Sequence, residues 1–127
     1  MAEPKRILLV EDDRFLRKAA EVRLRRAGYT VVTAADGEEA IASAATARPD
    51  LVLLDLIMPR MQGFEVLRVL RTQPNMEGVP IVVLTNLSQD ADREQVMTQG
   101  ANGYLVKANL SLDALADAVG EVLKGAA

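Results

Sequence analysis

The segment LVLLDLIMP, residues 51–59, places the carboxylate of Asp55 directly after four apolar residues. A short apolar run of this kind is typical of a strand that is covered on both faces. A carboxylate in such surroundings is costly unless it is paired or holds a metal ion. The rest of the chain must therefore supply partners for Asp55.

Four further short strands are predicted around this one, separated by longer segments with a helical period. The five strands are ILLV (7–10), TVVTA (30–34), LVLL (51–54), PIVVLT (80–85) and GYLV (103–106). Alternation of strands and helices predicts a parallel α/β domain. The first, third and fourth runs are apolar throughout, which predicts burial on both faces, whereas the more polar TVVTA suits an edge.

Several helix ends can be predicted from the sequence. Asp36 and Glu39 form a capping box before the second helix, Asp13 favours the positive end of the first helix, and Gly28 supplies its left-handed stop. The last helix should dock on the sheet through one apolar stripe: Leu112, Leu115, Val119, Val122 and Leu123. The fourth helix, residues 90–99, has only three residues to bury, so it should be the least firmly held: Ala91, Val96 and Met97.

Composition narrows the function further. The 127 residues fit a single domain, 1–127, with 15 basic and 18 acidic side chains and a net charge of -3. This balance argues against binding to nucleic acid or an anionic membrane. The absence of cysteine and histidine excludes disulfides, thiolate chemistry and a serine–histidine triad. No apolar run approaches the roughly 18 residues of a membrane helix, so we expect a cytoplasmic protein.

Polar residues follow the predicted strands at one edge of the sheet. Glu11 and Asp12 follow the first strand, Asp55 the third and Lys107 the fifth, while Thr85 ends the fourth. The carboxyl ends of parallel strands meet at one rim, so these groups should converge there. Clustered carboxylates repel one another, and a hard divalent cation such as Mg²⁺ relieves that repulsion. An aspartate beside a metal, a hydroxyl and a lysine is equipped to receive a phosphoryl group.

The chain resembles the receiver domains of two-component response regulators from about Lys5 to Leu123. The matching stretches are ILLVEDD, AADGEEAI, LVLLDLIMPRMQGFEVLR, VPIVVLT and GANGYLVK. The resemblance implies a flavodoxin-like, doubly wound (βα)5 fold with the strand order 2-1-3-4-5 that is typical of receivers. Nothing follows the predicted fifth helix, so we expect a stand-alone receiver unless this chain is excised from a longer protein.

The resemblance assigns roles at the site by motif. Asp55 matches the phosphoacceptor, and Glu11 and Asp12 match the acidic pair for Mg²⁺, with Asp12 the direct ligand and Glu11 acting through water. Ile57 matches the position that lends a backbone carbonyl to the metal.

The remaining matches concern the response to phosphorylation. Thr85 and Lys107 match the switch hydroxyl and the site lysine, and Tyr104 matches the switch aromatic. The implied donor is a histidine kinase or a histidine phosphotransfer protein. The implied output is a protein contact, or a phosphorylation-dependent dimer, through the face of the fourth helix, fifth strand and fifth helix. The protein is not expected to be an enzyme beyond catalysing its own phosphorylation and dephosphorylation.

This chain departs from the family pattern near the site. Ala108 follows the lysine where the family commonly has a cis proline, and Asn86 follows the switch hydroxyl where a small residue is usual. The resemblance places Ile57 and Leu87 on either side of the path by which water would reach the phosphoryl group. Both are apolar, which predicts slow loss of that group.

Other functions fit the sequence less well. A flavodoxin-like cofactor binder needs a phosphate loop where this chain has EDDRFLR, and an aspartyl phosphatase needs a second aspartate where Ile57 stands. A receiver-shaped interaction module that is never phosphorylated remains an alternative. Six basic residues on the first helix form either a solvated face or a docking site: Arg14, Arg17, Lys18, Arg23, Arg25 and Arg26.

Overall fold

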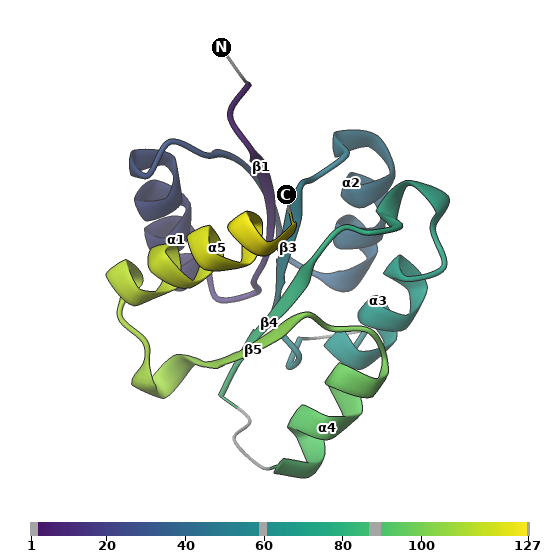
Figure 1. The fold of residues 1–127 in the computed structure, drawn as a ribbon. Coiled ribbons are helices and arrows are strands. Elements are labelled where there is room, and N and C mark those ends of the chain that lie inside the picture. Colours follow the sequence, from purple (N-terminus) through teal and green to yellow (C-terminus); the bar gives the residue numbers. More distant parts are fainter. Residues whose placement is uncertain (1–2, 59–60, 87–89, 127) are drawn as a thin grey trace.

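Strand and helix alternate five times in the computed structural model, which describes residues 3–58, 61–86 and 90–126 (Figure 1). The strands are β1 (Arg6–Val10), β2 (Thr30–Ala34), β3 (Leu51–Leu54), β4 (Ile81–Thr85) and β5 (Gly103–Val106). The helices are α1 (Arg14–Arg26), α2 (Gly37–Ala47), α3 (Gly63–Leu70), α4 (Asp90–Thr98) and α5 (Leu112–Ala126). Two short 3-10 turns complete the order, η1 (Pro74–Met76) and η2 (Lys107–Asn109).

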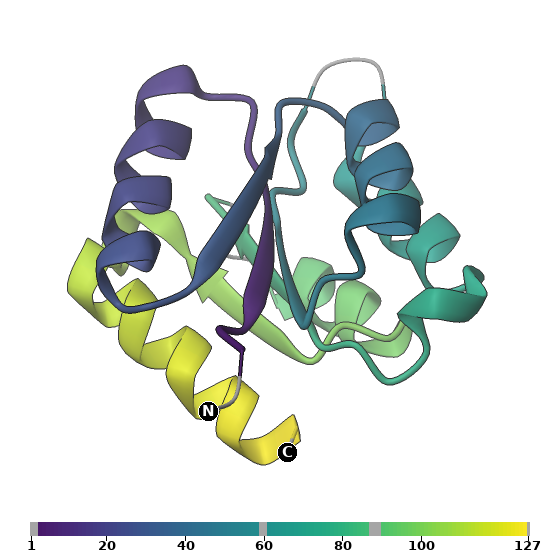
Figure 2. The ribbon, with the colours of Figure 1, turned by 90° about the horizontal axis from the view of Figure 1, so that it is seen from above.

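The sheet is parallel throughout, with the order β2-β1-β3-β4-β5. This confirms the predicted strand order and the edge position of β2. It also confirms the buried strands, since every residue of β3 and β4 and all of β1 except Arg6 are buried. α1 and α5 lie together on one face of the sheet, and α2, α3 and α4 cover the other (Figures 1 and 2).

The core consists of two apolar layers, one on each side of the sheet. Leu8 and Val10 of β1 face the layer under α2 and α3, while Ile7 and Leu9 face the layer under α1 and α5. This alternation is the period of two that a strand imposes on its side chains. It explains why the inner strands need apolar residues at every position.

The predicted helix ends are confirmed. Asp13 caps α1 by accepting hydrogen bonds from the backbone N–H groups of Phe15 and Leu16, at 2.9 and 3.1 Å. Asp36 caps α2 by accepting from the N–H of Glu39 at 2.9 Å. Gly28 follows α1 with φ +101°, a conformation that side chains disfavour.

Burial of the last two helices differs in part from the prediction. Ala91 and Met97 of α4 are exposed, so the prediction that they are buried was wrong. Val96 is the one buried residue among the α4 side chains that the structure describes. Leu112, at the first turn of α5, is also exposed because it lies at the rim of the α1–α5 interface. The rest of the predicted α5 stripe packs on the sheet: Leu115, Val119, Val122 and Leu123.

Candidate functional site

The central strands deliver the acidic residues to one rim of the sheet. β1 and β3 are neighbours with Val10 opposite Leu54, so Glu11 and Asp55 leave adjacent strands at the same level. The backbone N–H of Asp55 donates to the carbonyl of Val10 at 3.1 Å, which extends the pairing past the strand ends. The predicted convergence of these two carboxylates follows from this register.

Three carboxylates form a group that can hold a cation. Oxygen atoms of Glu11, Asp12 and Asp55 lie within 4.8 Å of one another. Glu11 and Asp55 are buried, with exposed fractions of 1% and 3%, whereas Asp12 is exposed. A purely carboxylate donor set suits a hard cation such as Mg²⁺. The site therefore has a closed inner side and an open side at Asp12.

Lys107 bridges the two buried carboxylates. Its Nζ lies 2.6 Å from Glu11 Oε1 and 3.0 Å from Asp55 Oδ2. The second Glu11 oxygen, Oε2, accepts from the backbone N–H of Asp13 at 3.1 Å. Both oxygens of Glu11 thus have partners within the protein, and one lysine faces two buried acids.

These contacts shift the ionisation of both partners. Burial raises the pKa of the Glu11 carboxyl to about 7, against the opposing hydrogen bonds from Lys107 and the Asp13 N–H. Burial lowers the pKa of the Lys107 ammonium, but its hydrogen bonds to Glu11 and Asp55 outweigh burial and the pKa is raised overall. The lysine remains charged at neutral pH. The carboxylates carry more negative charge than it balances, which favours a bound cation.

Thr85 lies on β4, the strand next to β3, and Tyr104 lies on β5, the strand beyond it. Thr85 is fully buried at the end of β4, opposite Val106, the residue before Lys107. Tyr104 is partly buried on the side of the sheet that carries α4, and packs against the core there. Burial raises the pKa of its phenol, and the charge of Asp92 on α4 adds to this effect while Arg93 opposes it. Tyr104 therefore lies within the electrostatic reach of α4.

A family model for response regulator receiver domains matches residues 7–120. The chain belongs to this receiver family. Its members are signalling modules with no enzymatic activity apart from their own phosphorylation. None of the described helices of this receiver is long and apolar enough to cross a bilayer.

Curated relatives align with most of this receiver's length. It is 44% identical over 103 residues to the probable transcriptional regulator ycf27 of Cyanophora paradoxa, covering 81% of this chain and 42% of that protein. It is 40% identical over 103 residues to the alkaline phosphatase synthesis transcriptional regulatory protein PhoP of Bacillus subtilis, with the same coverage of 81% and 42%. The receiver thus spans about two fifths of the length of these relatives.

Solved structures share its fold. The chemotaxis protein CheY4 of Vibrio cholerae superposes with a TM-score of 0.89 at 35% identity, covering 94% of this chain and 98% of that one. The receiver domain of the sensor histidine kinase PA1611 of Pseudomonas aeruginosa superposes with a TM-score of 0.86 at 35% identity, covering 95% and 98%. In that structure a magnesium ion is coordinated in the active-site cleft.

Three positions near the receiver site bear on the expectations that were based on its departures from the family pattern and on its apolar flanks. The Lys107–Ala108 peptide is trans, since the described residues contain no cis bond, and the segment continues as η2. Asn86 is exposed after β4, and Leu87 lies outside the described residues. Ile57 is half exposed, at 51%, and its N–H donates to Asp55 Oδ1 at 3.1 Å.

Sequence reasoning missed one residue that shapes the acidic loop. The guanidinium of Arg17, which we had grouped with the basic surface of α1, donates to the carbonyl of Glu11 at 2.8 Å and to that of Asp12 at 3.3 Å. It therefore holds the backbone between β1 and α1. Its position one turn into a helix that follows three acids was the available signal, but nothing in the sequence indicates which basic residue turns inward.

Proposed function

We propose that this receiver accepts a phosphoryl group on Asp55 in a Mg²⁺-dependent reaction, from a histidine kinase or a histidine phosphotransfer protein. The observation that carries the proposal is the bridge from Lys107 to Asp55 and Glu11 beside the open carboxylate of Asp12. Family membership supports a kinase as the partner. A cytoplasmic location goes with this proposal.

Mg²⁺ fits the donor set. Asp12 and Asp55 are the direct carboxylate ligands in this proposal, with the backbone carbonyl of Ile57 as a further oxygen. Glu11 acts through a bound water in this proposal, and its Oε1 lies 2.6 Å from Lys107 Nζ. The ion coordinated in the PA1611 receiver domain supports Mg²⁺ as the metal. When bound, the metal neutralises charge on the phosphoryl oxygens as the donor approaches.

The protein's own groups carry the transfer. An Asp55 carboxylate oxygen attacks phosphorus in line, an oxygen–phosphorus bond forms, and the bond from phosphorus to the donor breaks with its electron pair leaving on the donor. Lys107 lies 3.0 Å from Asp55 Oδ2, where it would stabilise negative charge on the phosphoryl oxygens. Thr85, at the end of the neighbouring strand, would donate a hydrogen bond to one of them.

The proposed output is a change in the face formed by α4, β5 and α5. Movement of Thr85 toward the phosphoryl group would alter the packing of Tyr104, which already lies near the charges of α4. α4 is the element to respond because Val96 alone among its described side chains is buried. A downstream protein, or a second phosphorylated copy, would bind the altered face.

The test is phosphorylation by acetyl phosphate, followed by intact-protein mass spectrometry. We expect one added phosphate with Mg²⁺, none after chelation, and none in Asp55→Asn. Asp50→Asn is a matched control. Asp50 directly precedes β3, so it lies at the amino end of that strand, whereas Asp55 follows its carboxyl end. Equal labelling of Asp55→Asn and wild type would contradict the assignment. An unlabelled wild type would instead favour the interaction module that is never phosphorylated.

A further inference from the structure

Gly63, the first residue of α3, lies directly against the backbone of Asp55. Its N–H donates to the carbonyl of Leu56 at 2.9 Å. A Cβ atom at this position would lie 2.4 Å from the carbonyl oxygen of Asp55 and 2.4 Å from Cα of Leu56. Both contacts are far below van der Waals distance, and both are to backbone atoms that no side-chain rotation can remove.

Backbone conformation does not explain this glycine. The described glycines with positive φ are Gly28, Gly78 and Gly100, and Gly63 is not among them. Any residue could adopt its backbone angles at the start of a helix. The requirement is therefore steric: α3 approaches the peptide between Asp55 and Leu56 so closely that only hydrogen fits between them.

Gly37 offers a close comparison, because it also begins a helix and is also buried. A Cβ there would lie 2.7 Å from Val66 Cγ2 and 3.0 Å from Met61 Cβ. Val66 Cγ2, the nearer atom, can shift by side-chain rotation, while Met61 Cβ at 3.0 Å needs to give by only a few tenths of an ångström. Alanine at position 37 would disturb the packing of α2 on α3, whereas alanine at position 63 must displace α3 or the acceptor's own peptide.

The acceptor backbone is thus held from two sides. The N–H of Asp55 bonds to Val10 of β1, and its carbonyl faces Gly63 of α3. The carboxylate in turn contacts the Ile57 N–H at 3.1 Å and Lys107 Nζ at 3.0 Å. A shift of this peptide would carry the carboxylate away from both groups.

We infer that Gly63 is a positioning residue for the phosphoacceptor: its missing side chain lets α3 press on the Asp55–Leu56 peptide and sets the direction of the Asp55 carboxylate. This inference rests on the proposed function of Asp55. In-line transfer is sensitive to such placement, since an error of about 1 Å can cost a factor of roughly one hundred in rate.

The test compares Gly63→Ala with Gly37→Ala in the complete chain. With acetyl phosphate and saturating Mg²⁺, we expect Gly63→Ala to be phosphorylated at least about tenfold more slowly than wild type, and Gly37→Ala within about twofold. The amide resonances of Ile57 and the affinity for Mg²⁺, measured by titration calorimetry, should change in Gly63→Ala alone. These two readouts separate displacement of the site from a general loss of stability.

Two results would overturn the inference. One is wild-type phosphorylation and Mg²⁺ affinity in Gly63→Ala, and the other is an equal loss in both variants. If Gly63→Ala does not fold, the comparison is repeated in a Gly120→Ala background, which stabilises α5 at a place where the added Cβ meets only the Tyr29 hydroxyl at 3.6 Å. A wild type that binds Mg²⁺ but takes no phosphate would refute the proposed function. The effect of Gly63→Ala on Mg²⁺ affinity would then still test whether Gly63 positions the Asp55 carboxylate.

Discussion

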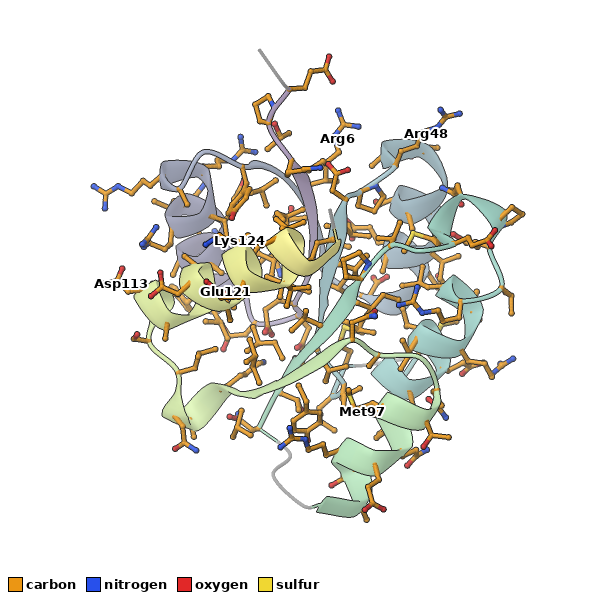
Figure 3. All side chains as sticks on the ribbon, viewed as in Figure 1. Arg6, Arg48, Met97, Asp113, Glu121 and Lys124 are labelled. Carbon is orange, nitrogen blue, oxygen red and sulfur yellow. The ribbon has the colours of Figure 1, made fainter. Side chains whose placement is uncertain are left out.

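The two helices on either side of β5 are held to the sheet in very different ways. α5 buries Leu115, Ala116 and Val119, while three of its charged side chains face solvent in Figure 3: Asp113, Glu121 and Lys124. α4 buries Val96 alone among its described side chains and exposes Met97 at 42%. The difference indicates where a conformational response is least costly. α5 contributes several side chains to the core, whereas α4 contributes one among those described, so displacement of α4 costs less burial.

The largest expected effect comes from truncating the buried side chains that hold each helix to the sheet, Leu115 on α5 and Val96 on α4. Leu115→Ala should lower the free energy of unfolding by about 3 kcal/mol, because it leaves a cavity in the layer beneath α1 and α5. Val96→Ala removes less volume from a site that can collapse, so it should cost about 1 kcal/mol. Urea unfolding measures both. Equal losses would show that α4 is as firmly anchored as α5.

The second prediction separates the helices by their response. Beryllofluoride, a phosphoryl mimic, should change hydrogen exchange of residues 86–108 by about tenfold, equivalent to about 1.4 kcal/mol in opening free energy. Residues 115–123 of α5 should change little because they are held by the core. Asp55→Asn with beryllofluoride is the control. Changes confined to α5, with the mimic shown to be bound, would reverse the comparison.

A third substitution should stabilise α5 without affecting α4. Gly120→Ala removes a glycine from the interior of α5, and the new Cβ meets only the Tyr29 hydroxyl at 3.6 Å. The expected gain in unfolding free energy is about 0.8 kcal/mol. Thermal unfolding measures the gain, and exchange in α4 should remain as in wild type. Destabilisation would mean that Gly120 has a packing role against Tyr29.

The smallest expected effect concerns the rate at which Asp55 loses its phosphoryl group, with the response of α4 left unchanged. Ile57 is half exposed beside Asp55 and cannot hydrogen-bond a water molecule. Ile57→Asn should speed loss of phosphate about threefold, which corresponds to about 0.65 kcal/mol in the barrier, while exchange in α4 keeps its wild-type response. Phosphate release after donor removal gives the rate. An unchanged rate would exclude control of water access by this side chain.

Local patterns predicted much of this structure. The strands at 30–34, 51–54 and 103–106 have the expected bounds, and the cap at Asp36 and the stop at Gly28 are where the sequence placed them. These features depend on residues close together in the chain, so the local sequence carries the information. The exposure of Ala91, Met97 and Leu112 was predicted wrongly because helical period alone does not show how far a helix overhangs the sheet.

The sequence by itself determined the alternation of elements, the apolar inner strands and the residue types that follow each strand. Only the tertiary structure decided which of these residues meet: Lys107 with Glu11 and Asp55, at 2.6 and 3.0 Å. It also decided that Arg17 turns inward to the acidic loop, and that Gly63 lies against the acceptor's peptide. The physical reason is that the Lys107 contacts join segments far apart in the chain, while the Arg17 and Gly63 contacts span a turn between a strand and a helix. All of these distances depend on strand register and helix docking, which no local pattern encodes.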